Sequence, residues 1–344
     1  MKTNVAAARD MATKLLTTVG VRPDRATATA RALVLAEVWG LASHGLLRLP
    51  GYLDRTLAGG HPADADLKTV TDTGSLVVLN GGGGLGHWQL GEAVDLGIGR
   101  ARDHGVALVA VGDSGHCGAL GVFAADAAEA GMTALVFSTG PAVLPPWGGD
   151  KRLLSTSPLA AGFPTKPRPA VVDLAMSTVA RGKIAAYAAR GEKLPDGWAF
   201  DGSGEPTNDP DAALVGMLSP LGGAKGYALA FMVEALTAGL VGPARAQQVA
   251  DFFDKDARHR RQGISHLTII IDPTRTDLEG HATGAQTRLL ELAEAAENAG
   301  GRIPGARRLA PSDVTDETQI EVPDPLWKQL ISRFPTPLEA ADIE

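Results

Sequence analysis

The chain has 344 residues, of which 44% are hydrophobic and 21% charged, and its formal net charge at pH 7 is -7. This composition is typical of a globular protein with two or three structural units around one or two cores. The acidic balance argues against nucleic acid or an anionic membrane as the main partner. The single cysteine, Cys117, cannot cross-link the fold and fits a reducing compartment.

The sequence also lacks the patterns that direct a chain into or across a membrane. Residues 1–4 lead into an alanine-bearing segment without an apolar signal core. The most apolar long segment, residues 226–242, is interrupted by Glu234 and Gly239 and is interpreted as a buried helix. We therefore expect a cytoplasmic protein without a membrane partner.

Hydrophobic periodicity predicts two N-terminal helices, over residues 4–19 and 23–40, with Asp24 as candidate N-cap of the second. Strands and helices then alternate along the chain. Strands are predicted at 75–80, 106–111 and 133–138, helices at 88–104 and 119–130, and one short strand at 159–163 in a loop-rich segment over 139–168.

The second half of the chain continues this mixture. The predicted elements are a strand at 170–174, helices at 179–190 and 226–240, a strand at 264–271, a helix at 285–299 and a last helix that begins at Asp324. Residues 191–224 are expected to be mostly loop because turn residues punctuate them. The fold class is α/β, but the strands are too irregularly spaced for the eight regular units of a TIM barrel.

A glycine run at residues 81–86 satisfies the G-x-G-x-x-G pattern of dinucleotide-binding turns. Almost any glycine run contains that pattern, and the nearest acidic residue at a strand end, Asp113, lies too far beyond Gly86. The following helix would begin with His87 and Trp88, which pack poorly against a pyrophosphate. The favoured interpretation is a flexible turn or lid.

The most informative pair is His44 and Arg48, four residues apart just past a predicted helix. If helical geometry continues, both side chains point to the same side. A histidine can exchange a proton near neutral pH, and an arginine can bind a carboxylate through two parallel hydrogen bonds. The pair suits an enzyme that reduces a carbon beside a carboxylate, although such residues can also be plain helix-dipole partners.

A second candidate is His116, which a glycine-rich turn presents after the strand at 106–111. Ligands tend to bind at such sheet edges. Cys117 beside it lacks the further ligands that a zinc site needs, so no metal is expected and Cys117 is interpreted as a packing residue.

Three other segments carry residues suited to a nucleotide. Asp173 ends a strand before hydroxyl residues and a helix, which offers N–H groups to a phosphate, although it could be a plain N-cap. Lys225 begins the apolar helix without the spacing of a P-loop. A tight loop at 302–308 carries three arginines, and it is either a functional cluster of positive charges or a solvated turn.

Together these segments resemble the family of malate and L-lactate dehydrogenases with a non-Rossmann fold. That family also holds sulfolactate and ureidoglycolate dehydrogenases, diketogulonate reductase and the piperideine- and pyrroline-2-carboxylate (ketimine) reductases. The resemblance covers nearly the whole chain. The segments that carry it are Ser43-His44-Gly45 with Arg48 and Tyr52, His116-Cys117-Gly118, Pro146-Trp147-Gly148-Gly149, Ser155-Thr156-Ser157-Pro158, and residues 173–183, 197–200, 207–210 and 222–226.

The resemblance implies an NAD(P)-dependent oxidoreductase that acts, as a homodimer, on a small 2-oxo or cyclic 2-imino carboxylate. It implies an NAD(P)-binding and catalytic domain at residues 71–304, built on a largely antiparallel sheet. A helical domain, residues 1–70 joined by 305–344, is expected to complete the cleft.

The resemblance also implies roles for single residues. Arg48 would bind the substrate carboxylate, and either His44, with Ser43 beside it, or His116 would exchange the proton. The residues implied for the cofactor are Ser138 and Thr139 near the nicotinamide, Asp173, Leu174, Met176, Ser177 and Lys225 at the ribose and phosphates, and Gly305 and Arg307 at the adenosine end.

Two departures from the family pattern refine these expectations. Many relatives carry an acid just after the Pro-Gly of the last loop, whereas Arg307 and Arg308 lie here, and arginines accommodate a 2′-phosphate, which favours NADP over NAD. Gly140 disfavours the ureido substrate, and the residue after His116 is closer to the ketimine reductases. A 2-hydroxy acid dehydrogenase, a ketimine reductase and, remotely, an inactive cofactor-binding paralogue are left open.

Overall fold

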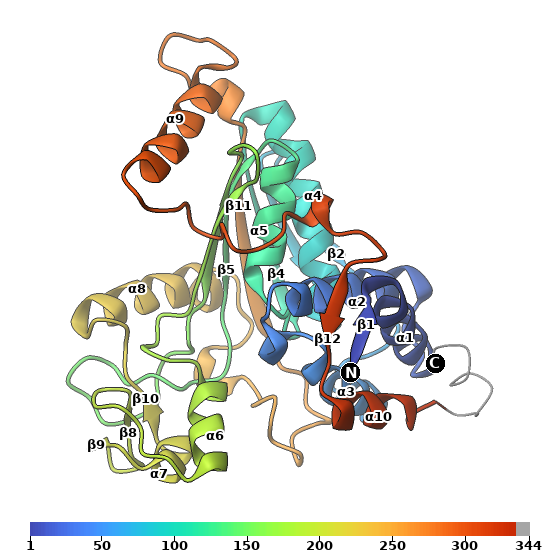
Figure 1. The fold of residues 1–344 in the computed structure, drawn as a ribbon, viewed down its shortest axis with the longest axis vertical. Helices are drawn as coiled ribbons and strands as arrows, with labels where there is room; N and C mark the ends of the chain where they lie inside the picture. The colour runs from blue at the N-terminus through green and yellow to red at the C-terminus, as the bar shows by residue number, and fades with distance from the viewer. Residues whose placement is uncertain (335–344) are drawn as a thin grey trace.

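β11 (Ile264–Ile271), from late in the chain, lies at the centre of a seven-stranded sheet in the computed structural model, which describes residues 1–334 (Figure 1). The strand order is β2-β3-β4-β11-β5-β6-β7. The other strands are β2 (Lys68–Asp72), β3 (Leu76–Asn80), β4 (Val106–Ser114), β5 (Thr133–Ser138), β6 (Leu159–Phe163) and β7 (Ala170–Leu174). Within the described part, β3–β4 is the one parallel pairing in this sheet. The expected mixed α/β fold is therefore confirmed.

Helices cover both faces of this sheet (Figure 1). α4 (Gly86–His104) and α5 (Leu120–Glu129) pack on one face, where Leu90 and Phe123 join Val136 and Ile270 in one apolar cluster. α8 (Ala224–Glu234) covers the other face through Val233, which packs with residues of β5 and β11. β11 is consequently covered on both sides, and even its polar residues Ser265, His266 and Thr268 are buried.

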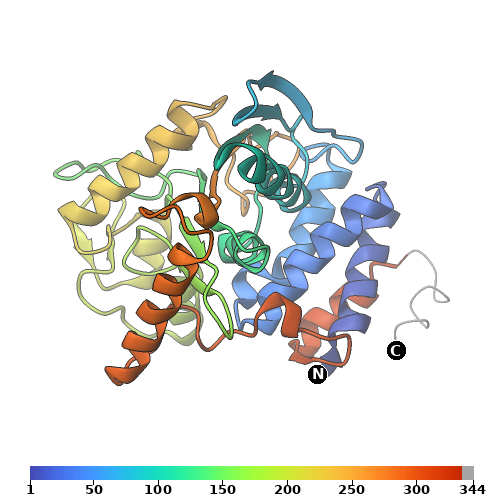
Figure 2. The ribbon, with the colours of Figure 1, turned by 90° about the horizontal axis from the view of Figure 1, so that it is seen from above.

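A helical layer joins the two ends of the described chain (Figures 1 and 2). It contains α1 (Val5–Thr18), α2 (Pro23–Val38), α3 (Leu49–Leu57), α10 (Asp324–Ile331) and the short pair β1 (Lys2–Asn4) and β12 (Gln319–Glu321). Met11, Leu15 and Leu33 pack there against Trp327. The part of the expected C-terminal segment at 335–344 lies outside the described residues.

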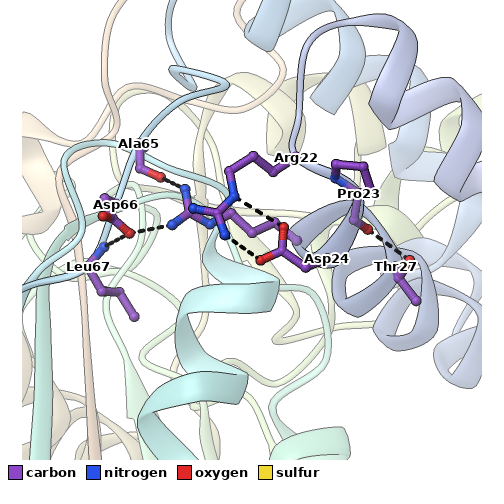
Figure 3. Close-up of polar contacts among 8 residues, drawn as sticks. Arg22, Pro23, Asp24, Thr27, Ala65, Asp66 and Leu67 are labelled. Carbon is purple, nitrogen blue, oxygen red and sulfur yellow. Dashed lines mark hydrogen bonds and ion pairs between the residues drawn. The ribbon is translucent and has the colours of Figure 1, made fainter.

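The start of α2 differs from the sequence prediction. The N-cap is Arg22 rather than Asp24, because Pro23 already occupies the first helical position. Asp24 lies in the first turn, where its charge complements the helix dipole, and it binds the Arg22 guanidinium (Figure 3). Arg25 binds the carboxylate of Asp66, which fastens α2 to the connection before β2.

A smaller layer follows β7, and it includes the helix predicted at 179–190 together with elements in the segment 191–224, where mostly loop was predicted. It holds α6 (Arg181–Arg190), α7 (Pro210–Val215) and a small sheet of β8 (Ala199–Phe200), β9 (Pro206–Thr207) and β10 (Met217–Leu218). Ile184, Leu194 and Leu218 share one apolar cluster there. Further along, α9 (Gly284–Asn298) packs through Ala293 near Ala170 of β7.

The apolar helix at 226–240 is not fully buried, in contrast to its prediction. α8 continues as a short π-helical turn over Ala235–Gly239, and its outer face exposes Leu229 by 46%, Phe231 by 55% and Met232 by 40%. Within residues 1–334, none of the helices combines the length and apolarity that crossing a bilayer requires.

The glycine run forms the turn that was predicted as one alternative, but this turn is packed against its neighbours and is not a lid. Gly83 donates its N–H to the carbonyl of Asp113 over 2.6 Å, and Gln89 Nε2 donates to the carbonyl of Gly81 over 2.6 Å. A Cβ on Gly86 would lie 2.1 Å from the carbonyl oxygen of Gly115. The run is therefore a packed turn, which leaves no space for a pyrophosphate at Gly86.

We expect Gly86→Ala to lower the free energy of unfolding by about 1–3 kcal/mol, because backbone must shift to admit the methyl group. Gly99→Ala in the same helix is the matched control, since a Cβ there meets open space and removes glycine's excess unfolded-state entropy. Urea unfolding of both variants measures the difference. Equal stabilities would contradict the close approach at Gly86.

Candidate active site

His44, Arg48, Tyr52 and His116 meet beside the end of β4. His44 and Arg48 each end a 3-10 turn, over Ala42–His44 and Leu46–Arg48, and Tyr52 lies in α3. The break at Gly45 means that no continuous helix joins the two residues, yet the stacked rings of His44 and His116 lie 6.0 Å apart. The structure thus gathers residues from two distant segments into one place.

Glu37 of α2 stabilises the backbone where the first 3-10 turn ends and the second begins. Its Oε1 accepts the N–H of Leu46 over 2.7 Å, and a Cβ on Gly45 would lie 2.5 Å from the same oxygen. Glycine is therefore needed after His44 so that the carboxylate of Glu37 can reach the backbone. Burial raises the pKa of Glu37, and the hydrogen bonds from Leu46 and Leu47 oppose that rise.

The hydrogen bonds of His116 define its tautomer. The backbone N–H of Gly118 donates to Nδ1 over 3.2 Å, and the Tyr52 hydroxyl lies 2.6 Å from the same atom. An N–H can only donate, so Nδ1 is the acceptor and the Tyr52 hydroxyl also donates to it. The proton of the neutral ring is then on Nε2. Burial, and next the charge of Arg48, lower the pKa of His116 well below its usual value.

His44 has a more permissive partner. Its Nδ1 lies 2.9 Å from Ser43 Oγ, and a hydroxyl can either donate to a neutral ring or accept from a protonated one. Burial first, and the neighbouring charge of Arg48 second, lower the pKa of His44 to about 4. The surroundings of His44 therefore accommodate both of its protonation states, whereas those of His116 favour one.

Arg48 presents a guanidinium that is anchored at one end. Its Nε donates to the carbonyl of Ser43 over 2.7 Å, and its guanidinium carbon lies 4.2 Å from the ring centre of Phe253. Within residues 1–334, its two terminal nitrogens make no hydrogen bond. This arrangement leaves the bidentate edge of the guanidinium available to a carboxylate.

The segment before β11 supplies a wall that sequence reasoning missed. The Phe252 ring packs edge-on against Tyr52 at 4.9 Å and lies 5.7 Å from His116. Gln262 Oε1 accepts the backbone N–H of His116 over 3.0 Å. Two adjacent phenylalanines in an otherwise charged loop were the available signal, but their target in space could not be known from the chain.

The residues expected near the nicotinamide lie at the end of β5 and are buried. Ser138 Oγ lies 2.9 Å from His266 Nδ1 and donates to the Thr139 carbonyl, while Thr139 Oγ1 donates to Glu234 over 2.9 Å. Their hydroxyls are therefore occupied within the protein. Ser138 and Thr139 can therefore contact a ligand only through their backbone atoms or after their side chains rearrange.

The residues expected near the ribose and phosphates differ in what they expose. Met176 packs in the apolar cluster of the smaller layer, and Ser177 Oγ donates to the Val179 carbonyl. Leu174 is half exposed, and Lys225 is exposed in the first turn of α8, a few residues after Pro220, which pairs with Ser177. The side chains of Met176 and Ser177 thus point inward.

Asp173 is not an N-cap, because α6 begins only at Arg181. Its carboxylate lies 3.8 Å from Arg308 Nη1 and beside the start of α5, where a Cβ on Gly121 would lie 2.7 Å from Oδ2. Burial raises the pKa of Asp173, and the charge of Arg308 opposes that rise. An acidic residue and an arginine therefore meet at the start of α5.

The arginine-rich loop encloses a cavity of about 360 Å³, lined by Trp39 and residues 302–308. Gly305 has a φ of +79°, and its backbone approaches β7 so closely that a Cβ would lie 3.1 Å from the Val171 carbonyl. The Arg308 guanidinium stacks over Trp39 at 5.0 Å. Cations and an aromatic face around a cavity suit an adenine ring and its phosphate, so these residues fit a dinucleotide.

Three further histidines, His61, His87 and His266, lie fully buried behind His116, and His87 is 6.5 Å from the His116 ring. Burial lowers the pKa of His61 and His266 to about 4 and that of His87 to about 3. In the described chain, no group of three or more metal-binding side chains has a geometry that would hold a metal ion. We interpret these histidines as neutral, structural residues.

These depressed pKa values predict acid sensitivity. Above pH 6.5 these histidines are neutral in both the folded and the unfolded state, so they do not reduce the stability of the fold. As the pH falls from 6.5 towards 4, the unfolded state takes up protons that the folded state cannot, and the free energy of unfolding decreases. Between pH 7 and pH 5 each histidine should cost about 2 kcal/mol of unfolding free energy. Urea denaturation at both pH values measures this, and the exposed variant His281→Gln should leave the difference unchanged. Equal stability at the two pH values would show that the histidines are not buried neutral.

The same chain holds a histidine pair beside a guanidinium with free terminal nitrogens and, elsewhere, a cavity suited to a nucleotide. These are the groups that an oxidoreductase acting beside a carboxylate requires. The family model for malate/L-lactate dehydrogenase matches residues 3–331. The chain belongs to that family and is an NAD(P)-dependent oxidoreductase. The resemblance to this family that the sequence motifs indicated is thereby confirmed.

Individual relatives agree with this assignment. The chain is 39% identical over 324 residues to the (2R)-3-sulfolactate dehydrogenase (NADP(+)) of Chromohalobacter salexigens, covering 94% of this chain and 95% of that protein. It is 33% identical to a Delta(1)-pyrroline-2-carboxylate/Delta(1)-piperideine-2-carboxylate reductase of Pseudomonas aeruginosa, covering 94% and 96%. Sulfolactate dehydrogenase from Methanocaldococcus jannaschii has a similar structure, with a TM-score of 0.87 and 28% identity over 97% of this chain and 96% of that one.

Proposed function

We propose that this enzyme interconverts a small 2-oxo or 2-imino carboxylate and its reduced 2-hydroxy or 2-amino form, with NADP as the preferred cofactor. The observation that carries the proposal is the free edge of the Arg48 guanidinium beside the stacked rings of His44 and His116. When bound, the cofactor supplies or accepts the hydride at C2. The residues of this chain then have to bind the carboxylate and manage one proton.

Arg48 binds the substrate carboxylate and so orients C2, which accounts for much of the rate enhancement. His116, whose Nε2 carries the proton, donates a hydrogen bond to the reacting oxygen or nitrogen and polarises it. His44 gives its proton to that atom during reduction and takes it back during oxidation. Ser43 supports both states of His44 because its hydroxyl can donate or accept.

The preference for NADP rests on the loop at 302–308. Arg307 and Arg308 line the cavity, and their positive charges would accept a 2′-phosphate. We assign the ribose and phosphates to Asp173, which pairs with Arg308, and to the start of α5. The name of the Chromohalobacter salexigens relative also specifies NADP(+).

The proposal includes a division of the chain into two domains. Residues 1–70 and 305–344 form the helical domain, and residues 71–304 form the cofactor domain.

We expect Arg307→Ser to raise the KM for NADPH by about 10- to 100-fold, the effect of removing one charge-assisted hydrogen bond. The KM for NADH should change little, because NADH lacks the 2′-phosphate. Initial rates with each cofactor give both constants, and Arg190→Ser, an exposed arginine paired with Glu192, is the control. A parallel change in both KM values would contradict the assignment of Arg307.

A homodimer is the proposed assembly. α8 and the segment that follows it expose the large apolar side chains of Leu229, Phe231, Met232 and Leu240. Several large apolar side chains exposed on one helix and its extension are typical of a subunit interface. Sedimentation velocity of the wild type and of Phe231→Glu would test it.

The reaction is tested by following nicotinamide absorbance. NADPH and NADH are each supplied with sulfopyruvate, oxaloacetate, pyruvate, Δ1-pyrroline-2-carboxylate and Δ1-piperideine-2-carboxylate. Turnover of any of these, inhibited by the matching reduced acid, supports the proposal, and turnover of the cyclic imines alone makes the enzyme a ketimine reductase. Cofactor binding without turnover of any carboxylate would instead support the inactive paralogue.

A further inference from the structure

Arg181, at the start of α6, faces the same aromatic ring as Arg48. Its guanidinium carbon lies 5.5 Å from the ring centre of Phe253, and that of Arg48 lies 4.2 Å from it. A Cβ on Gly182 would lie 3.9 Å from the Cβ of Ser43, so α6 begins directly against the segment that carries His44. The two arginines therefore flank one small region of the site.

We propose that Arg181 binds a second anionic group of the substrate and makes this enzyme selective for dianionic 2-oxo and 2-hydroxy acids. This inference rests on the proposed function, because it takes Arg48 as the residue that binds the carboxylate beside C2. The second group is a sulfonate or carboxylate on C3. A three- or four-carbon acid that spans C1 to this group is of the size that two guanidinium groups sharing one ring can hold.

The local balance of charge favours an anion. Arg181 Nη1 is paired with Asp251 over 2.7 Å, and Arg152 lies near both. Three guanidinium groups, those of Arg48, Arg152 and Arg181, thus lie around one carboxylate. The positive charge of Arg181 is one of the influences that lower the pKa of Arg48, after burial as the main cause. A bound anion relieves this repulsion between like charges.

The hydrogen bonds of the two neighbouring arginines indicate that Arg181, and not Arg152, is available to bind the second anion. The Arg152 guanidinium donates to the carbonyls of Gly216, over 2.8 Å, and Val215, over 2.7 Å. Beside the Asp251 pair, Arg181 makes one long contact, 3.4 Å, to the Leu214 carbonyl. Three of its five N–H groups have no partner among residues 1–334, so Arg181 can take up another anion while keeping Asp251.

A monoanionic substrate leaves these N–H groups without a partner. Pyruvate and the cyclic imino acids carry one carboxylate, which Arg48 binds, and gain nothing from Arg181. Sulfopyruvate and oxaloacetate carry a second anion and gain a charge-assisted hydrogen bond. Selectivity of about 10- to 100-fold in kcat/KM follows from one such bond in a partly buried site.

The test compares Arg181→Gln with the wild-type enzyme on sulfopyruvate, oxaloacetate, pyruvate and Δ1-piperideine-2-carboxylate with NADPH. We expect kcat/KM for the two dianions to fall by about 10- to 100-fold, mainly through KM, with the monoanions unchanged. Arg181→Lys should recover part of the loss, because it restores the charge without the planar donor set. Arg190→Gln, at the other end of α6, is the matched control.

The thermal midpoint and NADPH affinity of each variant show whether the fold is intact. A fold-intact Arg181→Gln enzyme that loses activity equally on all four acids, or on none, overturns the inference. A wild-type enzyme that prefers the monoanions also overturns it and leaves the proposed reaction standing. A wild-type enzyme that turns over no carboxylate counts instead against the proposed function, and sulfopyruvate-dependent protection against thermal unfolding, lost in Arg181→Gln, then tests the Arg181 site separately.

Discussion

Arg48→Ala is expected to raise KM and to lower kcat/KM by about 100- to 1000-fold, on every carboxylate substrate that the enzyme accepts. The variant removes two charge-assisted hydrogen bonds to the carboxylate and the orientation of C2 that they give. It also leaves the carboxylate in a site walled by Phe252 and Phe253, where an unpaired charge is costly. Steady-state kinetics on the wild-type enzyme's best substrate measure the change.

Arg48→Lys separates charge from geometry. A lysine keeps the positive charge but cannot hold both carboxylate oxygens in a planar fork, so its kcat/KM should lie between those of the wild type and Arg48→Ala. The Nε bond from Arg48 to the Ser43 carbonyl gives a structural alternative, in which either variant merely loosens the turn at Ser43. That alternative predicts a lower thermal midpoint, and kinetics unchanged in both variants would exclude any substrate role for Arg48.

The long regular elements of this fold were predictable, and the short ones were not. The predicted strands at 133–138, 159–163, 170–174 and 264–271 coincide with β5, β6, β7 and β11, because apolar runs bounded by turn residues identify them. The strands β8, β9 and β10 have two residues each, which is too short for a period. Their pairing depends on the apolar cluster that Leu194 and Leu218 form with Ile184. Such contacts between separate segments cannot be read from local sequence.

α3 was missed for a different reason. Pro50 and Gly51 at its start are usual turn signals, but a proline in the first turn of a helix has no intrahelical N–H to lose. Gly51 is needed because a Cβ there would lie 2.7 Å from the Phe252 ring. Gly51, which looks like a helix breaker, thus leaves room for the Phe252 ring that packs against Tyr52.

The candidate site was predicted in its residues but not in their hydrogen bonds. The sequence pointed to His44, Arg48 and His116 as chemically useful, and the structure brings them together. The sequence alone could not indicate that Gly118 and Tyr52 both donate to His116 Nδ1, because these hydrogen bonds depend on where α3 lies against the end of β4. This pair of donors is what distinguishes the two histidines.

His44→Gln is expected to lower kcat by about 100- to 10,000-fold, the usual effect of losing a general acid–base group. Glutamine can hydrogen-bond but cannot exchange a proton. In the oxidation direction, wild-type kcat/KM should be constant at neutral pH and fall as the pH drops towards the pKa of His44, about 4, because the base must be unprotonated. A carboxylate bound to Arg48 offsets the second cause of that low pKa, so the limb for kcat should lie higher. His44→Gln should lose this limb.

His116→Gln should be milder, because glutamine reproduces the neutral tautomer. Its carbonyl can accept from Tyr52 and Gly118 as Nδ1 does, and its amide can donate towards the substrate as Nε2 does. We expect a loss of about 10- to 100-fold with the pH limb intact, whereas His116→Ala, which removes the donor, should lose about 100- to 1000-fold. The reverse pattern, in which His116→Gln abolishes both turnover and the pH limb while His44→Gln keeps them, would make His116 the residue that exchanges the proton. Tyr52→Phe distinguishes the two assignments further: with one donor to Nδ1 gone, the pKa of His116 should rise, and only a proton-exchanging His116 would carry that rise into the rate profile.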